Sequence, residues 1–281
     1  MIRKFWITNG TKTGGVLNEW HFTDQSFKCF LHNPSGLGFT KTLTTIRYGN
    51  RQNIVDMTDS FPSVQGELMF YDDDNSNRYE KYNDFVRFVS HSPLVFYYQL
   101  PYLDALNNDI IYTLECDAVN LQKTETKTDG VLTCGITFTG LGFWQGTKVS
   151  ASGSGATYTL TNPGDFPVGF EITITGTSME NPYFTLEQDS EMYGEAKFYD
   201  GSNLFNKVYV DSIDGEQNVE LEQGGSVLPN PLSYQDLSIS NGSIYVTFVK
   251  LARGQSTLTI GMDSGSITSV SISFTPIYRS V

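Results

Sequence analysis

The chain has 281 residues, of which 14% are aromatic and only 17% are charged, together with 26 glycines and 10 prolines. This composition favours turn-rich β structure, because helical proteins use more Glu, Lys and Leu. The net charge of −13 excludes tight nucleic-acid binding through phosphate neutralisation. No apolar run approaches the ~20 residues of a membrane span, and the N-terminus lacks the apolar core of a signal peptide. We therefore expect synthesis in a cytoplasm and no insertion into a membrane.

The N-terminal part of the chain predicts short strands separated by turns. Residues 1–30 alternate around aromatic side chains, with TNGTKTGG as a connecting loop. Residues 31–42, LHNPSGLGFTKT, carry turn chemistry, since Asn33 before a proline opens a turn and Gly36 and Gly38 allow positive φ. Further strands are expected on either side of GNR and before an acidic turn, at 43–48, 53–56 and 64–71.

Residues 77–90 contain the one strong amphipathic helix pattern in the sequence. Asn77 and Glu80 predict a capping box at its start, and Pro93 ends it. The acidic residues 72–74 precede it, where the helix dipole favours negative charge. The apolar stripe expected to face a sheet is Tyr79, Tyr82, Phe85, Val86 and Val89. A buried-looking strand, PLVFYY, follows at once, so the helix is expected to cover one sheet face.

The clearest hairpin pattern joins residues 110–120 to residues 131–139. Centring its loop at KTETKTDG pairs Cys116 with Cys134, and every other pair on that face is apolar. A disulfide between these two residues is geometrically possible. Reduced core thiols are the expected state, because the 3 cysteines form neither a disulfide framework nor a metal-binding spacing. The two apolar rows are Tyr112, Leu114, Cys116 and Ala118, and Leu132, Cys134, Ile136 and Phe138.

The composition changes after Trp144. The segment QGTKVSASGSGA is small, polar and rich in glycine and serine, which predicts a linker or an exposed loop. Beyond it, short strands recur between turn signals without a helix pattern, which predicts a β-sandwich or jelly roll. The expected strands are 156–161, 168–175, 183–187, 195–199, 207–211, 218–221, 244–251, 256–261 and 268–275.

The sequence presents no constellation of residues that carries chemistry. His21, His32 and His91 stand apart from one another and from the cysteines, so no metal or catalytic role is expected. His32, beside a loop, and His91, at a helix end, are expected to face solvent or to cap. The segment DDDNSN lacks the glycine and the terminal glutamate of an EF-hand loop and is expected to be an acidic turn. We therefore predict no enzyme activity, no catalytic or cofactor-binding residues and no metal. One alternative stays open, namely a pair of carboxylates at the separation that a glycosidase requires, which the sequence alone does not reveal.

Exposed aromatic residues in the second half have two open uses. They suit either a sugar-stacking platform or contacts with proteins. The candidates are Tyr183, Tyr193, Tyr199 and Tyr234.

The order of several segments resembles the N-terminal domain of siphophage distal tail proteins. These segments are LHNPSGLGFTKT, VQGELMFYDD, YEKYNDFVRFV, PLVFYYQLP and the hairpin IYTLECDAVNLQKTE–DGVLTCGITFTGLGFW. The second half, with NPYFTLEQDSE, GQSTLTIGMDSG and SISFTPIYRSV, is similar to the galectin-like sandwich that follows in that family. The resemblance implies a mainly β protein. A sandwich-like domain at 1–145, with one helix and a long hairpin, precedes a galectin-like or jelly-roll β-sandwich at 146–281. In an alternative arrangement, the last strand, residues 271–281, packs back on the first domain.

The resemblance also implies a function. Such proteins are structural components of the virion at the distal end of the tail, and are made in the host cytoplasm. They form a ring, expected to be hexameric, that joins the tail tube protein to tail-tip, baseplate and receptor-binding proteins. DNA passing through an acidic channel would be contacted only non-specifically, because phosphate and carboxylate repel. The alternative is a carbohydrate-binding sandwich that takes a host saccharide and contributes to host attachment.

Overall fold

A computed structural model describes residues 3–48, 50–72, 75–124, 131–198, 204–227, 244–246 and 248–281. The chain divides into two compact units, one of Met1–Thr147 with Tyr278–Val281 and the other of Lys148–Ile277. The predicted mainly β fold with a single α-helix is confirmed for the described residues. In that part of the chain, no helix has the length and apolar character that crossing a membrane requires.

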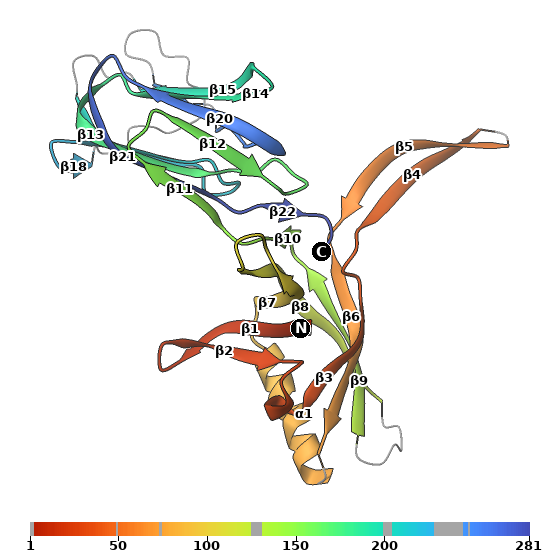
Figure 1. The fold of residues 1–281 in the computed structure, drawn as a ribbon. Helices are drawn as coiled ribbons and strands as arrows, with labels where there is room; N and C mark the ends of the chain where they lie inside the picture. The colour runs from red at the N-terminus through yellow and green to blue at the C-terminus, as the bar shows by residue number, and fades with distance from the viewer. Residues whose placement is uncertain are drawn as a thin grey trace. The chain divides into compact units, whose positions relative to one another are not determined.

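The first unit is built on one nine-stranded sheet (Figure 1). Its main path runs β2-β1-β7-β8-β9-β6-β3, and the short strands β10 and β22 pair beside that path. A 3-10 turn at Gln25–Phe27 leads into β3. The bounds are β1 Lys4–Thr13, β2 Val16–His21, β3 Cys29–Ser35, β6 Ser63–Tyr71, β7 Leu94–Leu103, β8 Asp109–Thr124, β9 Val131–Gly140, β10 Trp144–Gln145 and β22 Ile277–Tyr278.

The core of the first unit lies between this sheet and helix α1, Asn75–Val89. Alternation along the strands turns alternate side chains toward this core, and those side chains are mostly aromatic or aliphatic. Phe85 is completely buried and its ring meets those of Trp20, Phe22 and Phe70 at centroid distances of 5.3, 6.1 and 5.8 Å. The helix therefore covers one face of the sheet, as its aromatic stripe predicts.

Two details of the predicted helix are wrong. It begins at Asn75 rather than at Asn77, because three successive residues here can cap a helix and spacing does not choose among them. The stripe also differs at its start: Tyr79 is 41% exposed, whereas Arg78 is buried. The long aliphatic stem of an arginine packs well against a core, and a reading based on apolar residues alone misses it.

The β8–β9 hairpin forms, but with another register. Cys116 pairs with Gly140 rather than with Cys134, and Cys134 lies opposite Lys123. A change of partner from residue 134 to residue 140 is an even step, so it keeps every apolar side chain on the core face. Alternation therefore fixes the face and leaves the register open. All three cysteines are free, so the possible disulfide is absent.

Two predicted loops are shorter than expected. Strand β1 runs through most of TNGTKTGG as far as Thr13, with an irregular register after Thr8. Strand β3 likewise continues to Ser35 within the predicted loop 31–42. Of the three turn residues expected there, Asn33 and Gly36 have positive φ angles of 47° and 82°, and Gly38 is not among the positive-φ residues.

A separate hairpin rises from the first unit between β3 and β6. Strands β4, Thr40–Tyr48, and β5, Arg51–Ser60, pair only with each other among the described strands (Figure 1). They extend the strands expected at 43–48 and 53–56. We call residues 40–60 the arm.

The second unit is a β-sandwich of two antiparallel sheets, as predicted. One sheet has the order β11-β21-β13-β16-β17-β18, and the other has the order β12-β20-β14-β15-β19. The bounds are β11 Val149–Gly153, β12 Thr157–Asn162, β13 Glu171–Glu180, β14 Tyr183–Gln188, β15 Glu191–Phe198, β16 Phe205–Asp211, β17 Asn218–Gln223, β18 Ser226–Val227, β19 Ile244–Val246, β20 Gly254–Gly261 and β21 Ser264–Phe274.

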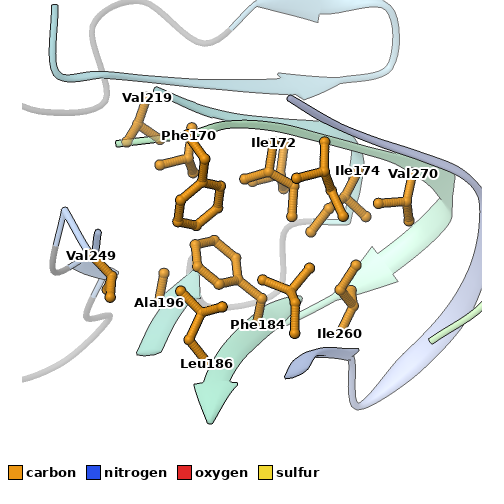
Figure 2. Packing of buried hydrophobic residues seen from close by; sticks show 14 of the residues in the cluster. Phe170, Ile172, Ile174, Phe184, Leu186, Ala196, Val219, Val249, Ile260 and Val270 are labelled. Carbon is orange, nitrogen blue, oxygen red and sulfur yellow. The ribbon is translucent and has the colours of Figure 1, made fainter. Parts of the chain in front are cut away.

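The inner faces of these two sheets meet in one apolar core (Figure 2). Phe170, Ile172 and Ile174 come from one layer and face Phe184 and Leu186 of the other. The rings of Phe170 and Phe184 meet edge to face, with centroids 6.0 Å apart, a favourable geometry for aromatic pairs.

The predicted linker after Trp144 contains a strand. Residues Val149–Gly153 form β11 and pair along β21, with Val149 opposite Phe274 and Ala151 opposite Ile272. Val149 and Ala151 pack on the core while Ser150 and Ser152 alternate with them. Small polar residues thus form an ordinary alternating strand here.

Other strand ends in the second unit also differ from the prediction. Strand β13 starts at Glu171 and continues to Glu180, within the expected turn TSMENP, with register shifts and a positive φ of 51° at Ser178. Strand β19 covers only Ile244–Val246 of the expected 244–251, although Leu251 forms a single bridge with Val168.

Candidate assembly surfaces

The three histidines lie in separate places. His21 stacks on Trp6 with a centroid distance of 5.8 Å, and its Nε2 is 2.8 Å from Glu19 Oε2. His91 Nδ1 lies 3.0 Å from the carbonyl oxygen of Arg87, where it caps the helix end, and His32 is exposed on β3. No group of three or more metal-ligating side chains occurs within the described ranges.

The cysteines are core residues. Cys29, Cys116 and Cys134 are all fully buried. Burial raises the pKa of Cys29 and of Cys116 to about 12, because removal from water disfavours the thiolate. Thiols in this state are poor nucleophiles at neutral pH.

The candidate sugar-stacking tyrosines do not gather at one described place. Tyr193 lies on β15 and donates its hydroxyl hydrogen to Ser256 Oγ at 2.9 Å, while Tyr183 is half-buried on β14. Tyr199 and Tyr234 lie outside the described residues. In the acidic turn, Asp72 forms an ion pair with Lys28 at 2.5 Å, and residues 73 and 74 also lie outside the described residues.

The arm is the first candidate surface. Its register places Leu43 opposite Met57 and Thr45 opposite Ile54, so three apolar side chains lie together on one face. The opposite face pairs Thr42 with Thr58 and Thr40 with Ser60 near the root, and carries Ile46 and Tyr48 toward the tip. The arm is thus apolar on one face along its middle, and its other face is polar near the root and carries two large apolar side chains toward the tip.

The apolar face of the arm is exposed. Leu43, Ile54 and Met57 are 50%, 59% and 54% accessible to solvent. A two-stranded hairpin is marginally stable in water by itself, and contiguous exposed apolar side chains mark interaction sites. The arm therefore has the physical character of one half of an interface.

The edges and outer face of the nine-stranded sheet form the second candidate surface. Strands β2 and β3 lie at the two ends of its main path, and edge strands offer unpaired backbone groups to another chain. On the face away from helix α1, alternation places Glu67, Glu115 and Asp117 opposite the buried row. This face therefore carries two carboxylates on β8 and one on β6.

An apolar hollow lies at the β3 edge of the same face. Its volume is ≈ 410 Å³ and its lining includes Phe30, Met69, Tyr71 and Val131. The rings of Phe30 and Tyr71 stack at 5.3 Å with an interplanar angle of 20°. The hollow therefore places an apolar surface next to the edge strand β3.

Sequence reasoning identified the two strands of the arm but not its role. Alternation says which residues share a face, and it does not say which strands join which sheet. A usable signal is present in the sequence, since Leu43, Ile54 and Met57 stand on two strands whose other residues are mostly polar.

The chain matches a known family over its first unit. Residues 4–141 match the family described as the distal tail protein, N-terminal domain. No curated protein sequence matches the chain significantly.

Solved structures of phage proteins share the fold of the whole chain. A chain from the crystal structure of SPP1 Dit, described as a paradigm of the hub adsorption apparatus in phages that infect Gram-positive bacteria, has a TM-score of 0.66. It is 11% identical, and the similarity covers 98% of this chain and 99% of that chain. A chain from the phage p2 baseplate in its activated conformation with Sr has a TM-score of 0.54. It is 12% identical, and both chains are covered fully. A corresponding chain from the structure with Ca has a TM-score of 0.53.

The sequence match identifies the first unit as the N-terminal domain of a distal tail protein of a phage, and the fold of the whole chain agrees with it. Through its first unit, the chain belongs to the distal tail protein family.

Proposed function

We propose that this chain forms the ring at the distal end of a phage tail that joins the tail tube protein to tail-tip, baseplate and receptor-binding proteins. It is made in the host cytoplasm, becomes part of the virion and catalyses no reaction. The match of residues 4–141 to the distal tail family carries this proposal. The exposed apolar arm supports it, because contiguous exposed apolar side chains suit contact with another chain.

The charge of the arm favours a second copy of this chain as its partner. The arm carries Lys41, Arg47 and Arg51 against Asp56 and Asp59, a net charge of +1, whereas the whole chain carries −13 and the remainder therefore −14. A weakly positive arm is attracted to an acidic neighbour. The arm of one copy and the surface that receives it on the next are different patches, and such head-to-tail contacts close into rings. Six copies are expected from the family resemblance.

The acidic outer face suits a channel. Glu67, Glu115 and Asp117 would repel the phosphates of DNA, so DNA passing along them would make only non-specific contacts. In this arrangement the helix-bearing face lies away from the channel.

The proposal is tested on the purified full chain. Mass photometry with negative-stain electron microscopy should show a ring of one defined size. Three exposed arm residues are then changed together, Leu43→Ser, Ile54→Ser and Met57→Ser, and the ring population should fall at least tenfold while the monomer stays folded. The matched control changes Thr42→Ala and Thr58→Ala on the opposite face and should leave the ring intact. Monomers only, at high concentration and in assembled particles alike, would contradict the proposal.

We propose saccharide binding by the second unit as the second candidate. It rests on a hydroxyl-rich face of the β12-β20-β14 sheet, where Thr157 and Thr185 both lie opposite Thr259, beside Tyr183. Hydroxyl groups next to an aromatic ring suit a sugar. A glycan array on the full chain decides it: binding lost in Tyr183→Ala supports a site, and no binding at millimolar glycan removes it.

A further inference from the structure

The root of the arm is held by a segment that follows the second unit in the sequence. We propose that residues Tyr278–Val281, here called the clasp, fix the direction of the arm, with Asp59 as the positioning residue. The clasp belongs to the first compact unit although residues 148–277 separate it from the rest of that unit. The inference depends on the proposed function only in treating the arm as an element of assembly.

Asp59 joins both strands of the arm to the clasp. Its Oδ2 lies 3.0 Å from Arg279 Nε, and its Oδ1 lies 3.8 Å from Lys41 Nζ. The Asp59 side chain is only 18% exposed, so it has given up most of its hydration and depends on these two cations for compensation. Loss of Arg279 would leave a largely buried carboxylate with one distant cation.

The clasp is itself firmly attached to the first unit. The backbone N–H of Val281 donates to the carbonyl oxygen of Leu37 at 3.0 Å, and Leu37 lies just before β4. The ring of Tyr278 meets that of Tyr112 on β8 edge to face, with centroids 5.2 Å apart. Val281 and Tyr278 also pack against the apolar core. Figure 1 marks the C-terminal end of the chain beside the root of the arm.

Contacts at its root are what can set the direction of the arm. Its strands pair with no other described strand, so a change at the root moves the whole apolar face. Beyond the clasp, the root holds an edge-to-face contact of Phe61 with Phe143, with centroids 5.1 Å apart. Next to it, the backbone N–H of Gly140 donates to the carbonyl oxygen of Pro62 at 2.8 Å. Both of these contacts are made after β5, so the Asp59–Arg279 ion pair and the Val281–Leu37 hydrogen bond are what restrict pivoting on the side of β4 and across both strands.

The place of the clasp in the sequence has a consequence for assembly. Residues 278–281 are synthesised after the whole second unit, so the root of the arm is completed only once that unit has been made. A shortened chain that ends inside the second unit would carry an arm without its clasp. The fold thereby couples a correctly directed arm to the presence of the second unit.

The direction of the arm can be followed by measuring the distance between two spin labels with double electron–electron resonance spectroscopy. Spin labels are attached at Asn53→Cys on the arm and at Asn83→Cys on helix α1, both of which are exposed. The three native cysteines are buried and stay unlabelled. Dilution of labelled with unlabelled chain at about one to ten leaves only distances within one copy, so the result does not depend on whether a ring forms.

The labelled chain with an unmodified clasp should give one narrow distribution of distances between the two labels. Asp59→Asn and Arg279→Gln should each broaden it at least twofold, whereas Arg279→Lys, which keeps the charge, should leave it nearly as narrow. The control Asp214→Asn removes an ion pair with Lys250 in the second unit and should change nothing. If Asp59→Asn fails to fold, the more exposed Arg279→Gln carries the test. Distributions that stay narrow in Arg279→Gln would overturn the inference, even if rings form normally.

Discussion

Replacing Phe85 by alanine tests whether helix α1 holds the first unit together. Phe85 has no exposed surface and its ring touches those of Trp20, Phe22 and Phe70, so it joins the helix to strands β2 and β6 and to the segment after β2. Truncation leaves a cavity among rings that already pack against one another. Substitutions of this kind in well-packed cores cost about 3–5 kcal/mol.

The size of this effect is large relative to the stability of a domain. Native domains are stable by about 5–15 kcal/mol, so a loss of about 3–5 kcal/mol would remove about a fifth or more of the free energy of unfolding of the first unit. With a urea dependence of about 2 kcal/mol per molar, a loss of about 4 kcal/mol moves the unfolding midpoint by about 2 M. Phe85→Asp should prevent folding of this unit altogether, because an unpaired charge would be buried.

The fluorescence of Trp20 reports the transition, since its ring lies 5.3 Å from that of Phe85. The matched control is Tyr79→Ala on the same helix, where the ring is 41% exposed and Lys123 Nζ lies 4.5 Å from its centroid. That change should cost less than about 1 kcal/mol. A loss below 1 kcal/mol in Phe85→Ala, or equal losses in the two variants, would refute the reasoning about which helix face is buried.

Two further predictions concern titration and thiols. The pKa of Glu171 is held below its ordinary value of 4.5 by hydrogen bonds from Lys148 and Ser273; its contribution to stability is therefore complete above pH 4.5 and lost as pH falls through the folded-state value. Glu171→Gln should flatten this acid limb in the second unit, and an unchanged limb in a pH series of urea melts would contradict the assignment. Native Cys29, Cys116 and Cys134 should resist iodoacetamide at pH 8 until the first unit unfolds, and reductant should not change the melting temperature. Rapid labelling of the native chain, or a melting temperature lowered by reductant, would show that they are exposed or bonded.

The sequence predicts the buried faces of this protein better than it predicts the partners of its strands. Leu114, Cys116, Cys134 and Ile136 all face the core as expected, because a two-residue period survives any even shift in register. The pairing of Cys116 with Gly140 depends on irregularities after Val119 that no apolar pattern announces. Register is thus set by turn and bulge geometry as well as by hydrophobicity.

The boundaries of elements were harder to predict for a related reason. Asn75 and Asn77 cap helices equally well, and the serine-rich segment after Trp144 suits a strand once Val149 and Ala151 have a core to face. Tertiary contacts decide such cases, and local propensity does not. The arm shows the same limit, since its two strands were expected but their separation from the sheet was not.

Electron microscopy of assembled tail particles, with an antibody fragment marking this chain, tests the central claim most directly. The account predicts a closed ring of fragment density at the distal end of the tail, with one repeat per copy around the channel and the first units innermost. Density along the tail shaft, at the head or absent from particles would contradict the claim that this chain is the distal hub.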